Sequence, residues 1–178
     1  MTLPDLLRGN LDLVFVGINP SIYSAERGHY FARKTNRFWP CLSASILSLT
    51  IRQALGVDRL YPEHDALLPD HGIGFTDVVK RPTARAGELS PAEFADGARN
   101  LVTKLEEFQP AIACFQGIMG FRPFLQVLAP ASPKPELGEQ PLRLGRTRLF
   151  VVPSPSPANA HATPAIQTGW YDRLAALR

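Results

Sequence analysis

Residues Val14–Ser21 read VFVGINPS and residues Gly28–Trp39 read GHYFARKTNRFW, and these two stretches decide the fold of the chain. The apolar run that ends at Gly17 is typical of a buried strand in a parallel sheet. Asn19 follows directly, at the end of the strand where parallel α/β sheets form their binding crevice. The second stretch places aromatic side chains among basic ones, a composition that suits a planar base beside phosphates. We therefore expect a nucleic-acid site at this end of the sheet.

Strand and helix signals alternate along the rest of the chain. Buried strands are expected at 11–16 and 111–115, a hairpin at 142–144 and 147–152, and helices at 38–49, 63–68 and 118–128 and from Ser90 and Thr163 onward. The Ser90 helix has the clearest signal, a capping box completed by Glu93. A long loop is expected after Pro20 and a surface connection at 129–141. The alternation predicts a single domain over 1–178, with a three-layer α/β/α fold and a mostly parallel central sheet.

The composition is that of a small folded domain with a mild preference for polyanions. The chain has 178 residues, 45% of them hydrophobic, a formal net charge of +3 and a pI near 9.1. Its two cysteines, Cys41 and Cys114, are predicted to be buried thiols, and they exclude a disulfide framework or a four-cysteine iron–sulfur cluster within the chain. Residues 1–10 lack the apolar core of a signal peptide, and no apolar run approaches ~20 residues. We expect a cytoplasmic monomer that makes no membrane contact.

Four motifs are spread over most of the chain. They read GINP at 17–20, FARKTNRFW at 31–39, GFTDVVKRPT at 74–83 and VPSPS at 152–156. In this order they resemble the motifs of the mismatch-specific uracil-DNA glycosylases, a family that includes the thymine-DNA glycosylases. Ser21 stands where the first family motif ends in glycine. The resemblance implies the fold of the uracil-DNA glycosylase superfamily.

The resemblance also implies an activity. It implies an enzyme that flips uracil, and with it mismatched thymine or related damaged pyrimidines, out of DNA and hydrolyses the N-glycosidic bond to leave an abasic site. The implied partners are uracil-containing duplex and single-stranded DNA, with a nucleoid-associated location and no cofactor or metal. The alternative is a catalytically weak module that binds damaged DNA. A zinc-dependent deaminase is excluded because its His-x-Glu and Pro-Cys-x-x-Cys ligand motifs are absent.

Several residues of the first two motifs are expected to form the base pocket. By the resemblance, Asn19 positions the attacking water through its carbonyl oxygen, and Phe31 stacks on the flipped base. Asn-Pro after a strand is more often a simple turn, and a Phe beside Tyr is more often core, but the other motifs favour the site. Gly17, Ile18 and Ser24 are expected to complete the base-binding wall.

Asp77 departs from the family pattern, in which the bacterial members often have lysine and the vertebrate branch asparagine. A carboxylate beside the sugar would stabilise an oxocarbenium ion and orient or deprotonate water, which an amide cannot do. The competing interpretation is a salt bridge to Lys80 or Arg81. The sequence leaves both open.

The DNA contacts are expected on the motif loops. Lys80, Arg81, Ser154 and Ser156 are candidates for phosphate or sugar, and Pro157 and Ala158 occupy the place of the family's duplex wedge. Because these two side chains are small, we expect the opposing base to be read loosely and single-stranded uracil to be accepted. The remaining basic clusters are Arg27, Arg33, Lys34 and Arg37, then Arg85, then Arg143, Arg146 and Arg148. Solvated surface is the alternative for each cluster, but their place beside the motifs favours phosphate contact.

Overall fold

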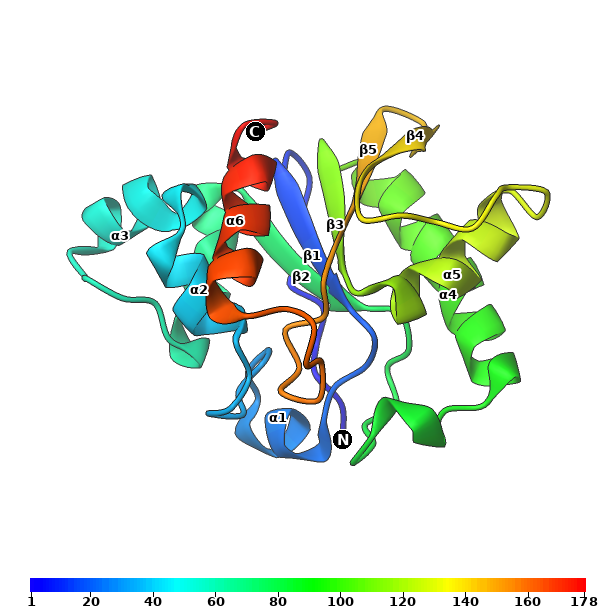
Figure 1. The fold of residues 1–178 in the computed structure, drawn as a ribbon, viewed down its shortest axis with the longest axis horizontal. Helices are drawn as coiled ribbons and strands as arrows, with labels where there is room; N and C mark the ends of the chain where they lie inside the picture. Colours follow the sequence, from blue (N-terminus) through cyan, green and yellow to red (C-terminus); the bar gives the residue numbers. More distant parts are fainter.

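A five-stranded sheet in the order β2-β1-β3-β5-β4 forms the centre of the computed structural model, which describes residues 1–178 (Figure 1). The strands are β1 (Leu13–Gly17), β2 (Ile73–Asp77), β3 (Ile112–Gln116), β4 (Gly138–Leu144) and β5 (Thr147–Val152). Only β4 is antiparallel, to β5, and the other pairings are parallel. This confirms the mostly parallel sheet and the predicted hairpin.

Helices cover both faces of the sheet. They are α1 (Ile22–Arg27), α2 (Phe38–Ala44), α3 (Leu49–Leu55), α4 (Pro91–Phe108), α5 (Ile118–Leu128) and α6 (Pro164–Ala175), with 3-10 turns at Ile46–Ser48, Pro62–His71 and Ala86–Glu88. In Figure 1, α2, α3 and α6 lie on one side of the strands and α4 and α5 on the other. The fold is therefore the expected three-layer α/β/α arrangement.

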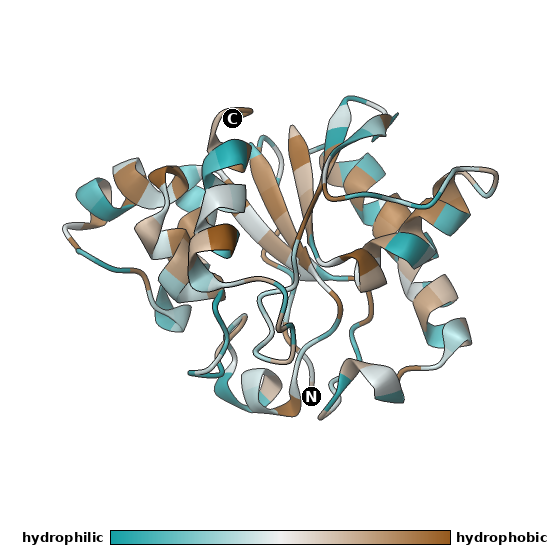
Figure 2. Ribbon diagram, in the orientation of Figure 1, coloured by the Kyte–Doolittle hydropathy of each residue, from teal (hydrophilic) through white to brown (hydrophobic).

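Side chains of β1 alternate between two apolar cores. Phe15 packs into a cluster with residues of α2 and α6, whereas Val14 and Val16 pack into a second cluster with residues of α4 and α5. Every residue of β1 is buried, as a strand covered on both faces requires, and apolar residues predominate along β1 and β3 (Figure 2). Cys41 and Cys114 are buried free thiols, as predicted.

Three expectations about the elements need correction. The predicted helix 38–49 is interrupted at Ser45, whose backbone is extended and whose hydroxyl donates to the Leu42 carbonyl (2.7 Å); a serine that bonds to the backbone in this way competes with the helix. The expected loop after Pro20 contains α1, because Ser21 accepts a hydrogen bond from the Ser24 amide as its N-cap. The expected connection 129–141 includes the first part of β4.

The parallel strands bring the motif loops together. Because β1, β2, β3 and β5 run the same way, the segments after Gly17, Asp77, Gln116 and Val152 leave from one edge of the sheet. The chain passes from β1 to β2 on one side of β1 and then from β2 to β3 on the other side. Open α/β sheets form a crevice where the strand order reverses in this way.

The basic cluster before β5 does not reach that crevice. Arg143 pairs with Arg148 near the turn of the hairpin, at the start of β5 and hence at the opposite edge of the sheet. Arg148 forms an ion pair with Glu139, and Arg146 donates to the Gln109 carbonyl. The expectation that this cluster lies beside the motif loops was therefore wrong, and with it the argument that it contacts phosphate there. No helix is both long and apolar enough to cross a membrane.

Candidate active site

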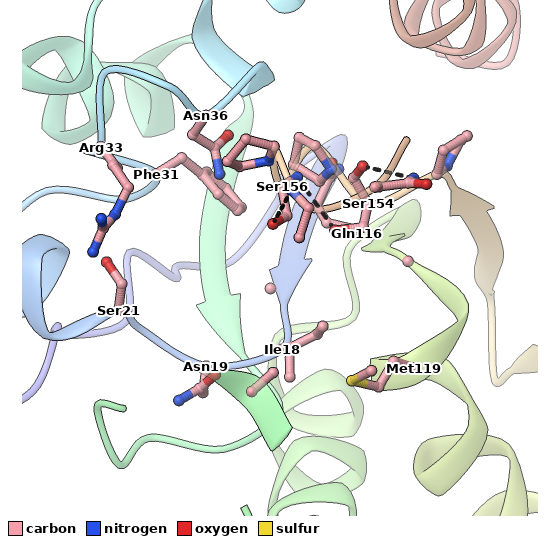
Figure 3. Close-up of a pocket in the computed structure, with 18 of the residues that line it drawn as sticks. Ile18, Asn19, Ser21, Phe31, Arg33, Asn36, Gln116, Met119, Ser154 and Ser156 are labelled. Carbon is pink, nitrogen blue, oxygen red and sulfur yellow. Dashed lines mark hydrogen bonds between the residues drawn. The ribbon is translucent and has the colours of Figure 1, made fainter. Parts of the chain in front are cut away.

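A cavity of about 910 Å³ opens at the carboxyl edge of the sheet. Its lining draws on all four motifs and includes Gly17, Ile18, Asn19, Ser24, Phe31, Asp77, Ser154, Ser156, Pro157 and Ala158. Figure 3 shows side chains from the segments after β1, β3 and β5 and from the Phe31 loop around this space. Of the sequence-predicted site residues, only Lys80 and Arg81 lie outside the lining.

The Asn19 amide is held in one orientation by the third motif. Its Nδ2 donates to the Arg81 carbonyl (2.9 Å) and to Thr83 Oγ1 (2.8 Å). The Thr83 hydroxyl donates its own hydrogen to the Arg85 carbonyl (2.8 Å), so it acts as an acceptor toward Asn19. Both amide hydrogens are thus used, and Asn19 Oδ1 accepts no hydrogen bond within the protein and is not buried. The result is a fixed, water-accessible acceptor on the cavity wall.

Backbone pairing holds the first and third motifs side by side. Thr83 N donates to the Pro20 carbonyl (3.2 Å), and Ile22 N donates to the Thr83 carbonyl (3.1 Å). This short parallel bridge extends the β1–β2 pairing beyond the sheet edge. The position of Asn19 is therefore set by backbone on both sides.

Phe31 has a strained backbone and a stacked ring. Its φ is +52°, a left-handed conformation that costs a non-glycine residue about 1–2 kcal/mol. The neighbouring amides are tied down, since Tyr30 N donates to Asp65 (2.9 Å) and Ala32 N donates to Ser24 Oγ (3.1 Å). The Phe31 ring stacks on Phe38 with centroids 4.3 Å apart. Ser24 itself is buried, and its hydroxyl ties this loop to α1.

Arg37 joins the second motif to the last one. Its Nη1 donates to the carbonyls of Asn159 (2.8 Å) and Ala162 (2.6 Å), and its backbone N donates to the Pro155 carbonyl (2.9 Å). The sequence placed Arg37 among phosphate contacts, but the structure uses its guanidinium to fix the loop after β5. The charge pattern of a loop in the sequence cannot reveal such an internal bond.

Asp77 is a buried carboxylate beside the cavity. It is the last residue of β2 and lies in register with Gly17, the last residue of β1. An ideal Cβ on Gly17 would lie 2.4 Å from Asp77 Oδ1, so the missing side chain of Gly17 makes the space that this carboxylate occupies. The same point is 3.7 Å from the tip of the Phe31 ring. Asp77 and Phe31 therefore border one space at the end of β1.

The charge of Asp77 is poorly compensated. Its Oδ2 has no hydrogen-bond partner, and the nearest cation, Lys80 Nζ, is 3.6 Å away. Burial raises the pKa of Asp77 to about 7, because desolvation outweighs the attraction of Lys80. The ion pair with Lys80, one of the two interpretations left open by the sequence, is thus present, but it is long and leaves the carboxylate able to take a proton near neutral pH. The interpretation of Asp77 as a catalytic group stays a prediction.

Lys80 and Arg81 are engaged within the protein. Lys80 Nζ lies 2.8 Å from Asp5 Oδ1 and donates to the Tyr30 hydroxyl (3.2 Å). Arg81 is exposed and forms an ion pair with Glu93 at the start of α4. The sequence assigned both side chains to DNA, whereas the structure commits the first to an internal network and pairs the second with a carboxylate.

The loop after β5 is folded on itself. Ser154 Oγ accepts from Ser156 N (3.3 Å), Ser156 Oγ accepts from Ala158 N (3.3 Å), and Asn159 Nδ2 donates to the Ser154 carbonyl (3.1 Å). Both serine hydroxyls keep their hydrogens free to donate. Pro157 and Ala158 are exposed, so they form the tip of the loop.

Thr83 and Arg33 are site residues to which the sequence assigned no individual role. Thr83 is the last residue of the third motif, and this place in the motif is the only signal of it in the sequence. Arg33 lines the cavity and is exposed, with no carboxylate in ion-pair contact. No group of three or more His, Cys, Asp or Glu side chains is placed to hold a metal ion.

Known proteins resemble this chain both at the level of a family model and at the level of a solved structure. The model of the family described as the uracil DNA glycosylase superfamily matches residues 4–175. The structure is similar to the solution NMR structure of a candidate uracil DNA glycosylase from Methanosarcina acetivorans, with a TM-score of 0.58 and 20% sequence identity. This similarity covers 99% of the present chain and 96% of the other. At that identity it establishes the fold.

Replacing Asp77 with asparagine is expected to stabilise the protein more at pH 8 than at pH 5. The pKa of Asp77 is raised from 3.8 to about 7, so the native state binds more protons than the unfolded state between these values and loses stability as pH rises toward 7. Asp77→Asn lacks this loss of stability, which amounts to about 3 kcal/mol in the free energy of unfolding between the two pH values. Urea unfolding at both pH values measures it, with the exposed Asp70→Asn as control. If the free energy of unfolding of Asp77→Asn differed from that of the wild type by the same amount at both pH values, Asp77 would titrate normally.

Proposed function

The chain belongs to the uracil DNA glycosylase superfamily, and on this premise we propose that it is a monofunctional enzyme that excises uracil from DNA. Membership makes it a DNA glycosylase that hydrolyses N-glycosidic bonds. The observation that carries the finer proposal is the pairing of a fixed amide acceptor, Asn19, with a poorly compensated carboxylate, Asp77, on one cavity. Mismatched thymine and related damaged pyrimidines are further proposed substrates.

The two side chains divide the work on the attacking water. Water donates one hydrogen bond to Asn19 Oδ1, which holds its oxygen toward C1′ of the flipped nucleotide. As the water oxygen bonds to C1′, the C1′–N1 bond breaks and its electron pair leaves with the uracil as an anion. Asp77 takes the proton of the water, and while ionised it stabilises the oxocarbenium character of the sugar. A pKa of about 7 suits a base that works near neutral pH.

Phe31 supplies the stacking surface for the flipped base. One face of its ring is covered by Phe38, and the residue also lines the cavity. A base that stacks there gains about 1–3 kcal/mol. The strained backbone of Phe31 supports a positional role, because strain of this kind is usually retained where function requires it.

The DNA strand is proposed to cross the loop beside α1. The guanidinium groups of Arg27 and Arg33 lie 4.9 and 5.7 Å from the centre of the Tyr23 ring, and neither forms an ion pair with a carboxylate. Arg33 also lines the cavity. These free cations are suited to the phosphates that flank a flipped nucleotide.

Release of free uracil from DNA oligonucleotides tests the proposal directly. The substrates are U·G and U·A duplexes, single-stranded uracil and T·G duplex, with cytosine-containing DNA as control. We expect uracil release from the first three. Tight binding to uracil-containing DNA without release of base would instead identify a damage-binding module.

Asn19→Ala is expected to lower the single-turnover rate of uracil excision by about 10²-fold or more, because the water loses its positioning acceptor. DNA affinity should change little, since this contact serves the transition state. Single-turnover kinetics and binding by fluorescence anisotropy measure the two effects. The control is Asn100→Ala, an exposed asparagine on α4. A rate within a few-fold of wild type would remove Asn19 from the mechanism.

The excision rate of the wild type is expected to rise with pH and to level off above about 7, because Asp77 must be ionised to take a proton. Asp77→Asn should be slower and should lack this acid limb. Single-turnover rates between pH 5 and 9 provide the measurement. An identical limb in the variant would assign the titration to another group and leave Asp77 with a structural role.

Ala158→Leu is expected to increase excision from duplex DNA more than from single strands. A larger side chain at the loop tip fills part of the space left by the flipped nucleotide and so offsets a cost of a few kcal/mol that single strands do not incur. Ala160→Leu is the matched control, because Ala160 is exposed on the same loop but does not line the cavity. Equal effects of Ala158→Leu on both substrates would show that the wedge lies elsewhere.

A further inference from the structure

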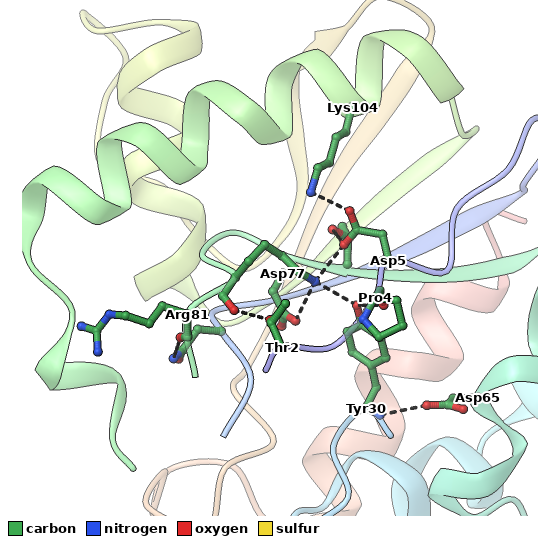
Figure 4. A network of polar contacts seen from close by, with 11 residues as sticks. Thr2, Pro4, Asp5, Tyr30, Asp65, Asp77, Arg81 and Lys104 are labelled. Atoms are coloured by element: carbon green, nitrogen blue, oxygen red, sulfur yellow. Dashed lines mark hydrogen bonds and ion pairs between the residues drawn. The ribbon is translucent and has the colours of Figure 1, made fainter. Parts of the chain in front are cut away.

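Asp5, which belongs to none of the four motifs, lies at the centre of a polar network behind the cavity (Figure 4). Its Oδ1 is 2.8 Å from Lys80 Nζ, and its Oδ2 is 2.6 Å from Lys104 Nζ of α4. Thr76, on β2, donates its hydroxyl to Asp5 Oδ1 (2.8 Å). Three donors, from β2, from the segment that follows it and from α4, thus converge on one carboxylate.

Backbone pairing fixes the position of Asp5. The next residue, Leu6, exchanges two hydrogen bonds with Phe75 of β2, at 2.9 and 3.0 Å. Gly74 allows this close approach, because a Cβ there would lie 2.4 Å from the Leu6 carbonyl oxygen. The N-terminal segment is therefore paired with the outer side of β2 at Phe75, two residues before Asp77 on that strand.

Lys80 lies between two carboxylates and is closer to one of them. Its ammonium is at hydrogen-bond distance from Asp5 (2.8 Å) but 3.6 Å from Asp77. The Tyr30 hydroxyl, which itself donates to the Pro4 carbonyl (2.9 Å), accepts from Lys80 as well. Asp5 and Tyr30 thus both lie within hydrogen-bond distance of the ammonium, whereas Asp77 Oδ2 is beyond it and has no hydrogen-bond partner.

Building on the proposed function, we propose that Asp5 is a positioning residue for the reaction: it draws the Lys80 ammonium away from Asp77 and so leaves Asp77 able to accept the proton of the attacking water. An ammonium in full contact with Asp77 would favour the ionised carboxylate and weaken it as a base. Asp5 prevents that contact by competing for the same cation.

The charged groups around Asp77 favour an arrangement in which Asp5 stays ionised and Asp77 titrates. The groups are Lys80 on the same segment, Asp5 from the N-terminal segment, Lys104 from α4 and the Tyr30 hydroxyl, with Asp65 beyond Tyr30. Burial tends to raise the pKa of Asp5, but the bonds from Lys104 and Lys80 outweigh it, so the net shift is downward. Asp5 is thus the permanent anion of the pair, and Asp77 is the group that titrates.

Removal of the Asp5 charge and removal of the Lys80 charge are expected to shift the titration midpoint of the Asp77 carboxyl group in opposite directions. In Asp5→Asn, Lys80 is free to approach Asp77 and a neighbouring negative charge is lost, so the Asp77 midpoint should fall by about one pH unit or more. In Lys80→Met, the attracting cation is lost and the midpoint should rise. Lys104→Met should also raise it, because Asp5 then keeps Lys80 more firmly.

Carbon-13 NMR titration of the aspartate carboxyl groups measures these shifts without any DNA. Asp77→Asn assigns the Asp77 resonance, and Glu139→Gln, which breaks an ion pair at the far edge of the sheet, is the control. An Asp77 midpoint that is unchanged or raised in Asp5→Asn would overturn the proposal. If Asp5→Asn does not fold, the two lysine variants decide the question, and an unchanged midpoint in both would overturn it equally.

The acid limb of the excision rate provides the link to the reaction. It should move to lower pH in Asp5→Asn, with a lower plateau rate because Asp77 is then a weaker base, and Asp5→Glu should restore part of the plateau. A lower rate with the limb at its wild-type position would show that Asp5 is structural only. If the wild type releases no uracil, the proposed function fails while the NMR titration still decides the place of Asp5 in the network.

Discussion

Burial of the Asp77 carboxylate at the end of β2 is the constraint on which the site depends. The glycine at position 17 leaves the space that the carboxylate fills, and the ammonium nearest to it is shared with Asp5. A carboxylate that is buried without a full partner destabilises the fold, so the surrounding elements must hold it there. The paired backbones of β1 and β2 and the N-terminal segment on β2 do so. In our proposal, the same lack of compensation makes Asp77 a useful base.

Several motif residues form hydrogen bonds that fix one motif loop against another. Arg37 fixes the loop after β5, Thr83 orients the Asn19 amide, and Ser24 holds the strained loop that carries Phe31. Trp39 contributes in the same way, since its Nε1 donates to the Tyr30 carbonyl (2.8 Å). Four segments that are distant in sequence thus become one rigid rim. Rigidity of this kind lowers the cost of ordering water and base in the transition state.

The sequence predicts the layers and the location of the cavity, because apolar runs, the Ser90 capping box and the ends of parallel strands are local signals. It does not predict the break at Ser45, where a hydroxyl competes with the helix. It also gives no sign of Asp5 or of the bond between Lys80 and Asp5, because that contact joins residues 75 positions apart. The charge clusters were the weakest guide: internal bonds use Arg37, and the fold carries Arg148 to the far edge of the sheet.

A double-mutant cycle on Asn19 and Asp77 tests the central claim most directly, namely that the two side chains act on one water. Single-turnover excision rates are measured for wild type, Asn19→Ala, Asp77→Asn and the double variant at a pH above 8, where Asp77 is ionised. If both residues serve the same water, the double variant should be about as slow as the slower single variant, because either change already removes the positioned nucleophile. Rate losses that multiply in the double variant would show that the residues act independently and would contradict the account.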